Sequence, residues 1–190
     1  MYLNFLYNKL MSRGCEYRYI STEERAVFFE KTEFSFMPDA REIYSRIVNG
    51  AAQADFWSVG VLWKFGGVYL DMDATLVCPI SWTLKDVATA LFTGKNRSDP
   101  TNFFLATTPE NPIFRETMLN IRKKILASDS GDLPVFDTTG PKSLAEILQH
   151  YDFTFKKRKY VCVQGFFANE RFQYADHPHG PWRGKGILQA

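Results

Sequence analysis

The stretch AQADFWSVGVLWKFGGVYLDMDATLVCPI, residues 52–80, contains the pattern that decides the fold. Apolar residues recur at helical spacing over residues 51–65, which predicts a helix. Gly66 and Gly67 end this helix, because glycine adopts the left-handed conformation needed past a helix end without a side-chain clash. The β-branched and aromatic run at residues 68–70 then predicts a short buried strand.

Two carboxylates, Asp71 and Asp73, stand at the C-terminal end of this predicted strand. In an extended backbone, residues i and i+2 point to the same side, so both side chains are expected to face one ligand. Two carboxylates placed side by side disfavour each other's ionisation unless a cation neutralises them. The simplest occupant is a hard divalent cation, Mn²⁺ or Mg²⁺, that bridges to phosphate oxygens.

The composition indicates a single domain with no nucleic-acid partner. The chain has 190 residues, of which 45% are apolar, and this is enough for a sizeable core. Its 17 Phe, 9 Tyr and 4 Trp exceed what an ordinary surface needs, so some should line a cleft, while Trp57 and Trp63 are expected in the core. The net charge is +2, and the basic run at residues 156–159 is interpreted as a solvated strand edge.

Cysteine usage and hydropathy favour a cytoplasmic location. Cys15, Cys78 and Cys162 are odd in number and widely spaced, which fits reduced thiols and argues against a disulfide scaffold or a zinc site. No stretch has the length of a transmembrane helix, and the N-terminus lacks the pattern of a signal peptide. The expectation is a soluble cytoplasmic protein or, alternatively, a soluble part of a longer membrane-associated chain.

The rest of the chain alternates predicted helices and strands. Ser21 and Glu24 form a capping box, which marks a helix start. Helices are predicted at residues 1–11 (with an apolar stripe of Leu3, Leu6, Tyr7 and Leu10), 21–29, 38–49, 113–126 and 144–150. Strands are predicted at residues 16–20, 89–93, 103–107, 152–155 and 160–163, and loops at 129–132 and 176–186. This alternation predicts an α/β fold with a single, mostly parallel sheet flanked by helices.

Two enzyme families place a short Asp-x-Asp motif at a strand end. In the first, the haloacid-dehalogenase phosphatases, the first Asp attacks phosphorus, and Asp71-Met-Asp-Ala-Thr-Leu76 differs from their DxDGT signature only at Ala74. Further residues of that pattern would be Thr93, Lys123 or Lys124, and Asp132 with Asp137. Two features argue against it: Asp132 follows a polar loop rather than a buried strand, and residues 1–70 precede a signature that normally opens its fold.

The second resemblance extends over more of the chain. Ala54-Asp55, a helix and then Phe65-Gly-Gly-Val-Tyr-Leu-Asp-Met-Asp73 resemble the DXD-containing glycosyltransferases, which include fungal Golgi mannosyltransferases and bacterial capsular transferases. The likeness continues in order through residues 102–106, Pro109, Pro112, residues 139–141, His177, His179 and Trp182, and covers about residues 15–182. It implies one GT-A domain over residues 1–190 that transfers sugar with retention from a nucleotide-sugar, a UDP- or GDP-sugar, to a glycan or another hydroxyl acceptor.

The resemblance also implies roles for individual residues at the metal and the diphosphate. Asp73 would ligate Mn²⁺ or Mg²⁺ directly, and Asp71 would contact ribose or sugar and reach the metal through water. His177 or His179 would add a metal ligand or a diphosphate contact. Trp182 would close over the diphosphate or the donor sugar. The implied catalytic residues are therefore Asp71 and Asp73, together with Asp55.

Other residues are implied to bind the donor. Asp55 would hydrogen-bond hydroxyls of the donor sugar, although it also suits a charge at a helix start. Gly67 and Tyr69 belong to the same implied donor site. Thr139 and Gly140 would offer backbone N–H groups to substrate, although an ordinary turn has the same sequence. The paired histidines likewise suit a solvated, proline-rich tail.

Two departures from the family pattern affect the expected function. The family usually has Arg three residues after the counterpart of Asp55, where this chain has Ser58, so a cationic donor contact is absent or comes from elsewhere. The usual first strand is also missing, so the protein is either a trimmed relative or part of a longer chain. Both departures leave open a non-enzymatic alternative, a degenerate domain that binds sugar nucleotides or serves as a scaffold.

Overall fold

The structure is a computed structural model that describes residues 2–128, 133–164 and 187–188. Its helices are α1 (Tyr2–Met11), α2 (Thr22–Lys31), α3 (Ala40–Arg46), α4 (Gly50–Phe65), α5 (Ile80–Leu84), α6 (Pro112–Leu126), α7 (Val135–Thr138) and α8 (Pro141–Leu148), with a 3₁₀ turn η1 (Arg158–Tyr160). Its strands are β1 (Gly67–Leu70), β2 (Ala74–Leu76), β3 (Ala90–Asn96), β4 (Asp99–Thr107), β5 (Thr154–Lys157) and β6 (Cys162–Gln164). The predicted α/β class is therefore confirmed.

The strands form two sheets, and their pairing is mostly antiparallel. The main sheet has the order β1-β4-β3-β5, and β2 pairs with β6 in a second, two-stranded sheet. Strand β4 is antiparallel to both β1 and β3, and among the described strands only the β3–β5 pair is parallel. The expectation of a single, mostly parallel sheet was therefore wrong. For β3 and β4 the reason is their short connection, since a parallel pair needs a crossover of a dozen or more residues.

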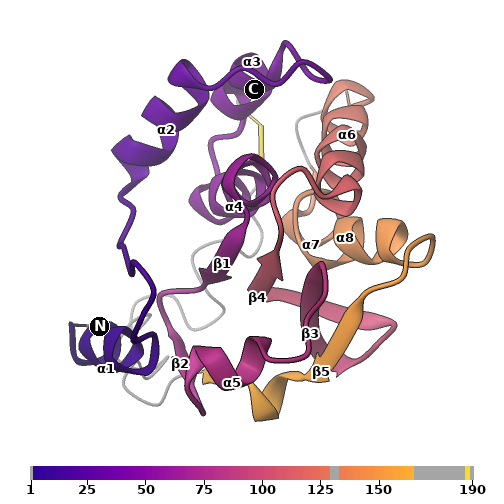
Figure 1. The fold of residues 1–190 in the computed structure, drawn as a ribbon. Coiled ribbons are helices and arrows are strands. Elements are labelled where there is room, and N and C mark those ends of the chain that lie inside the picture. The colour runs from indigo at the N-terminus through magenta and orange to yellow at the C-terminus, as the bar shows by residue number, and fades with distance from the viewer. Residues whose placement is uncertain (1, 129–132, 165–186, 189–190) are drawn as a thin grey trace.

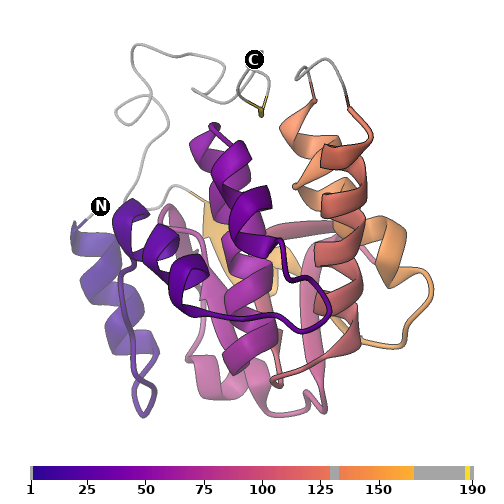
Figure 2. The ribbon, with the colours of Figure 1, turned by 90° about the horizontal axis from the view of Figure 1, so that it is seen from above.

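Each face of the main sheet packs against its own core. Phe92 on β3 and Leu105 on β4 pack with α4, α6 and α8, whereas their neighbours Leu91 and Phe104 pack with β2, β6 and α5. This division follows from the strand, in which successive side chains point to opposite faces. Figures 1 and 2 show α4 and α6 lying across one side of the strands, with α1 and α5 beyond the other side.

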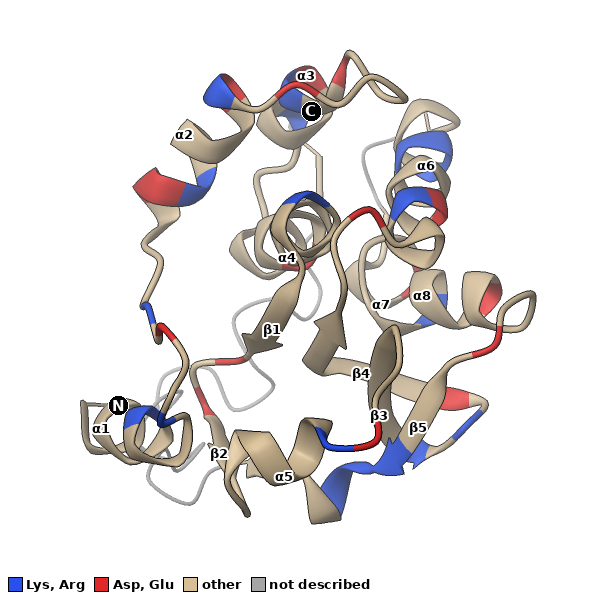
Figure 3. Cartoon of the chain, viewed as in Figure 1, with Lys and Arg blue, Asp and Glu red and all other residues tan. Residues whose placement is uncertain are grey.

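The predicted helices are confirmed, whereas several short elements differ from the prediction. Residues 16–20 form no strand, because none of the strands in the described residues pairs with them. The prediction missed β2, α5 and α7, which are only 3, 5 and 4 residues long. Strand β5 lies at the edge of the main sheet, as predicted for the basic run, and Figure 3 shows basic residues gathered there. In the described residues, no helix has the length and apolar character needed to cross a bilayer.

The connection from α4 to β1 explains how the site is placed. Helix α4 ends at Phe65, and Gly66 caps it by donating its N–H to Leu62 O at 2.8 Å. Gly66 has φ 66° and ψ −158°, a conformation almost restricted to glycine. A Cβ at Gly66 would lie 2.7 Å from the backbone nitrogen of Pro109. The predicted glycine stop is confirmed, and its close packing directs β1 along β4.

Candidate functional site

Asp71 and Asp73 lie in the turn between β1 and β2. Asp71 follows β1 directly and donates its N–H to Phe103 O at 3.1 Å, while Ala74 N–H donates to Asp71 O at 3.0 Å. The expectation that the two carboxylates follow strand alternation was therefore wrong, because residues 71–74 turn rather than extend. Both aspartates nevertheless line one cavity. Figure 3 shows acidic positions along this connection from β1 to β2.

Two asparagines of α1 hold the backbone of this turn. Asn4 Nδ2 donates to Met72 O at 2.8 Å and to Ala74 O at 2.7 Å. Asn8 Nδ2 donates to Ala74 O at 2.7 Å, and Asn8 Oδ1 accepts from Leu76 N–H at 3.0 Å. Each asparagine is only 1% exposed. Helix α1 therefore uses its polar side to fix the segment that carries both aspartates.

Asp55 joins three elements through its carboxylate. Asn102 Nδ2 on β4 donates to Oδ1 at 3.0 Å, and Thr139 Oγ1, after α7, donates to Oδ2 at 3.2 Å. Burial raises the pKa of Asp55 to about 7, against the lowering effect of these two hydrogen bonds. The first turn of α4 has no acidic residue, and Asn49 caps the helix. Asp55 is therefore not a helix-start charge.

Asp71 accepts a hydrogen bond from Tyr69, and the charges of Asp55 and Asp73 act on its carboxyl group. Tyr69 Oη donates to Asp71 Oδ1 at 2.5 Å. Burial, followed by the charges of Asp73 and Asp55, raises the pKa of Asp71 to about 8, while the bond from Tyr69 lowers it. Burial and the charge of Asp71 raise the pKa of Tyr69 well above its ordinary value. A cation at this position would therefore stabilise the ionised form of Asp71.

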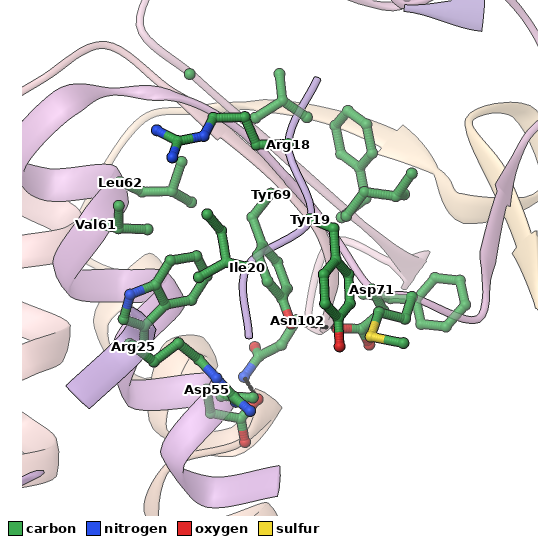
Figure 4. A pocket seen from close by; sticks show the side chains of 18 of the residues that line it. Arg18, Tyr19, Ile20, Arg25, Asp55, Val61, Leu62, Tyr69, Asp71 and Asn102 are labelled. Atoms are coloured by element: carbon green, nitrogen blue, oxygen red, sulfur yellow. Dashed lines mark hydrogen bonds between the residues drawn. The ribbon is translucent and has the colours of Figure 1, made fainter. Parts of the chain in front are cut away.

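One cavity of about 1990 Å³ brings these residues together. It is lined by Asp55, Tyr69, Asp71, Asp73 and Asn102, and Figure 4 shows Asp55, Tyr69, Asp71 and Asn102 around the same space. In the described residues, four buried side-chain polar atoms have no hydrogen-bond partner, and three belong to lining residues: Arg25 Nε, Trp57 Nε1 and Asn102 Oδ1. Since buried polar atoms are normally satisfied, this wall is suited to a polar ligand.

The predicted role of the Thr139 and Gly140 backbone was wrong. Both N–H groups already donate to Val135 O, at 3.0 and 2.8 Å, so neither is free for substrate. Thr139 acts instead through its hydroxyl on Asp55, while Gly140 lines the cavity. A Cβ at Gly140 would lie 2.9 Å from Phe136 Cα, so the close approach of this loop requires glycine.

The residues present fit a hard divalent cation that substrate helps to hold. Asp73 Oδ2 accepts from Gln164 Nε2 at 2.9 Å. Over the described ranges, no group of three or more His, Cys, Asp or Glu side chains could hold a metal. Mg²⁺ and Mn²⁺ are commonly bound by one or two carboxylates together with water and substrate phosphate oxygens, which matches this pair of aspartates. The predicted His177, His179 and Trp182 lie outside the described residues.

Several residues of the site were not predicted. Asn102 carried a signal, because it is a polar residue at the start of an apolar strand and lies in the stretch that resembles glycosyltransferases. No local sequence signal marked Arg25, Gln164 or the α1 asparagines. Trp57 belongs to the core, as predicted, and also lines the cavity. Ser58 stands where the family usually has a positively charged Arg side chain. It is fully buried, and its hydroxyl donates to Asp55 O at 2.8 Å.

Gly67 also lines the cavity, at the start of β1, with φ 95°. The structure therefore brings together Asp55, Gly67, Tyr69, Asp71, Asp73 and Gly140 from the predicted donor and metal sites. Thr139 is placed behind Asp55 rather than among the lining residues of the cavity.

A family model and a solved structure are similar to parts of this chain. Residues 1–91 match the family model described as the glycosyltransferase sugar-binding region containing a DXD motif, a match that includes Asp55 and Asp73 and ends before Asn102. The structure titled "PaToxG Glycosyltransferase" is 18% identical, with a TM-score of 0.42, over 66% of this chain and 40% of that chain. This chain thus corresponds to less than half of that protein's length, and no curated protein matches it. Residues 1–91 are therefore similar to the DXD-containing sugar-binding region of glycosyltransferases.

Proposed function

We propose that this glycosyltransferase depends on Mn²⁺ or Mg²⁺ and transfers a sugar, with retention, from a UDP- or GDP-sugar to a hydroxyl of a glycan or another acceptor. The observation that carries the proposal is the convergence of Asp55, Asp71 and Asp73 on one cavity. A nucleotide-sugar presents this wall with a negatively charged diphosphate and with sugar hydroxyls. Metal-bridged carboxylates suit the diphosphate, and a carboxylate held by hydrogen bonds suits the hydroxyls.

Asp71 and Asp73 are the proposed metal ligands. When bound, the divalent ion supplies Lewis-acid neutralisation of charge on the leaving nucleoside diphosphate. Tyr69 fixes the orientation of Asp71 through its 2.5 Å hydrogen bond, and Gln164 does the same for Asp73 at 2.9 Å. Oxygen atoms held in this way need little reorganisation when the diphosphate arrives. His177 and His179 remain proposed as an additional ligand or diphosphate contact, and Trp182 as a residue that closes over the donor.

Asp55 is the proposed contact to the donor sugar. Asn102 and Thr139 hold its two oxygens from different elements, so the carboxylate stays in one orientation beside the cavity. A sugar hydroxyl can donate to this carboxylate, and the bond positions the donor for transfer. Gly67, at which a Cβ would meet no atom within 4 Å, leaves open space for the donor, and Gly140 lines the same wall.

The decisive experiment measures release of nucleoside diphosphate from UDP- and GDP-sugars with and without Mn²⁺. Asp73→Asn should abolish turnover and Asp71→Asn should weaken it severely, while Asp86→Asn is the matched control because Asp86 is exposed and is not among the residues that line the cavity. Turnover that persists in excess chelator would rule out metal dependence. NMR of the product anomer decides between retention and inversion.

The alternatives make different predictions. The phosphatase pattern would need Thr93 and Lys123 or Lys124 beside Asp71. In the described part of the chain, Thr93 and Lys124 do not line the cavity, and Lys124 pairs with Glu146 at 2.7 Å. Phosphorylation of Asp71 by a generic phosphoester would favour the phosphatase. Binding of nucleotide-sugars without any turnover would favour the degenerate binding domain.

A further inference from the structure

The cavity contains basic residues as well as acidic ones, and these basic residues differ in their surroundings. Arg18, Arg25, Lys31 and Arg158 all line it. Arg18 lies 3.7 Å from Glu16 and its side chain is 64% exposed, and the Arg158 guanidinium lies 5.3 Å from the centre of the Phe103 ring. Lys31 is exposed at the end of α2. Among these four, only Arg25 has a buried donor atom without an acceptor in the described residues.

Arg25 reaches the cavity from α2. Its Nη2 donates to Thr22 Oγ1 at 2.8 Å, within the first turn of the helix, while its Nε is buried. Its charge acts on Tyr69, the residue that holds Asp71, by lowering the pKa of the Tyr69 hydroxyl. Figure 4 shows Arg25 extending into the space that Asp55, Tyr69 and Asn102 also surround. The guanidinium therefore lies on the side of the cavity that α2 contributes.

No carboxylate forms an ion pair with Arg25 in the described residues, although the charge of Arg25 is one of the causes that lower the pKa of Glu23 on the same helix. Six carboxylates nevertheless line the same cavity: Glu16, Glu23, Glu24, Asp55, Asp71 and Asp73. Arg25 as a whole is half-buried, but its Nε–H group is a buried donor without an acceptor, which is unfavourable until an acceptor pairs with it. The guanidinium is a planar fork of donors that matches the geometry of phosphate oxygens.

We propose that Arg25 binds a phosphate oxygen of the donor's diphosphate, from the side of the cavity formed by α2. The inference rests on the proposed function for the identity of the anion. Ser58 is buried and its hydroxyl is bonded to its own helix, so α4 offers no cation near Asp55 and Arg25 supplies one from a different helix. A positive charge at this position also stabilises the charge that develops on the leaving diphosphate.

The test compares Arg25→Gln with Arg41→Gln. Arg41 lies on α3, 3.8 Å from Glu30, with a side chain that is 70% exposed and outside the cavity lining, so it is a matched control. Calorimetric titrations with UDP and with GDP, each with Mn²⁺, give the dissociation constants. We expect Arg25→Gln to weaken diphosphate binding roughly 10- to 150-fold, with no change for uridine or guanosine. Arg25→Lys should restore part of the affinity because it keeps the charge but not the fork.

A second readout separates ligand binding from a structural role. Because the Nε–H group is buried without an acceptor, Arg25→Gln should leave the melting temperature of the ligand-free protein unchanged or raise it. A lowered melting temperature with unchanged diphosphate affinity would make Arg25 structural and overturn the inference. Equal losses for nucleoside and diphosphate would also overturn it. If the wild-type protein binds neither UDP nor GDP, the proposed function fails together with the inference, whereas wild-type binding that Arg25→Gln leaves intact refutes the inference alone.

Discussion

Replacing Asn4 with alanine removes the side chain through which α1 holds the turn at residues 71–74. Asn4 takes part in three hydrogen bonds, to Met72 O at 2.8 Å, to Ala74 O at 2.7 Å and from Thr75 Oγ1 at 2.7 Å. Each contributes about 1 kcal/mol net, so Asn4→Ala should lower the free energy of unfolding by about 3 kcal/mol. In a chain of 190 residues this corresponds to a fall in melting temperature of about 6–12 °C.

The same substitution should also weaken ligand binding, because the turn carries both proposed metal ligands. Loss of a group that orients a metal ligand typically lowers metal affinity about 10- to 100-fold. We therefore expect the dissociation constant of UDP or GDP in the presence of Mn²⁺ to rise at least about 10-fold. Calorimetric titration well below the melting temperature of the variant measures this constant on folded protein.

Asn120→Ala is the matched control for Asn4→Ala. Asn120 Nδ2 donates to Ser143 O at 3.2 Å, to Ser143 Oγ at 3.1 Å and to Glu146 Oε2 at 2.9 Å, so it links α6 to α8 and does not contact the turn. It should lose stability while its nucleotide affinity stays at the wild-type value. If Asn4→Ala also keeps wild-type affinity, the α1 asparagines stabilise the fold without positioning the aspartates, and the reasoning is refuted.

Three further predictions concern Asp55 and Gly66. Asp55→Asn should weaken binding of an intact nucleotide-sugar roughly 10- to 150-fold by calorimetry, with little change for the free nucleoside diphosphate; equal loss for both would contradict the proposed sugar contact. The unfolding free energy of the ligand-free protein should fall as the pH rises from about 4 to about 7, since folded Asp55 keeps its proton up to a pKa of about 7 and the unfolded carboxyl does not. Urea unfolding of Asp55→Asn should show a smaller slope across that range, and an unchanged slope would exclude Asp55 as its source. Gly66→Ala should destabilise the protein by about 1–3 kcal/mol, because the φ of 66° and ψ of −158° at Gly66 are nearly restricted to glycine. A wild-type melting temperature for this variant would refute the prediction.

The α4–β1 unit could be predicted because its rules are local. Helical spacing over residues 51–65 and the two glycines that follow depend only on neighbouring residues, and α4 ends where those glycines begin. Asp71 and Asp73 are close in sequence, so they had to lie near each other in any fold. Both aspartates of this stretch line one cavity with Asp55, although the local turn was mistaken for a strand end.

The direction of strand pairing and the face of α1 depended on long-range contacts. Strand alternation at residues 16–20 looked like a strand, but a strand needs a partner, and the described chain provides none there. On α1 the apolar stripe predicts burial of leucines, yet Leu3 is 65% and Leu10 is 53% exposed. The buried side chains are Asn4 and Asn8, because buried backbone carbonyls and N–H groups of β2 require partners.

By itself, the sequence therefore determined the six longer helices, the glycine stop and the pair of aspartates, because each arises from interactions between near neighbours. Only the tertiary structure decided that Asn102 and Thr139 hold Asp55. These two residues are 47 and 84 positions away from Asp55 along the chain. It also decided that Arg25 enters the same cavity. No local pattern encodes such a convergence, since it follows from how α2, α4, β4 and α7 pack and from which buried polar groups that packing leaves with or without a partner.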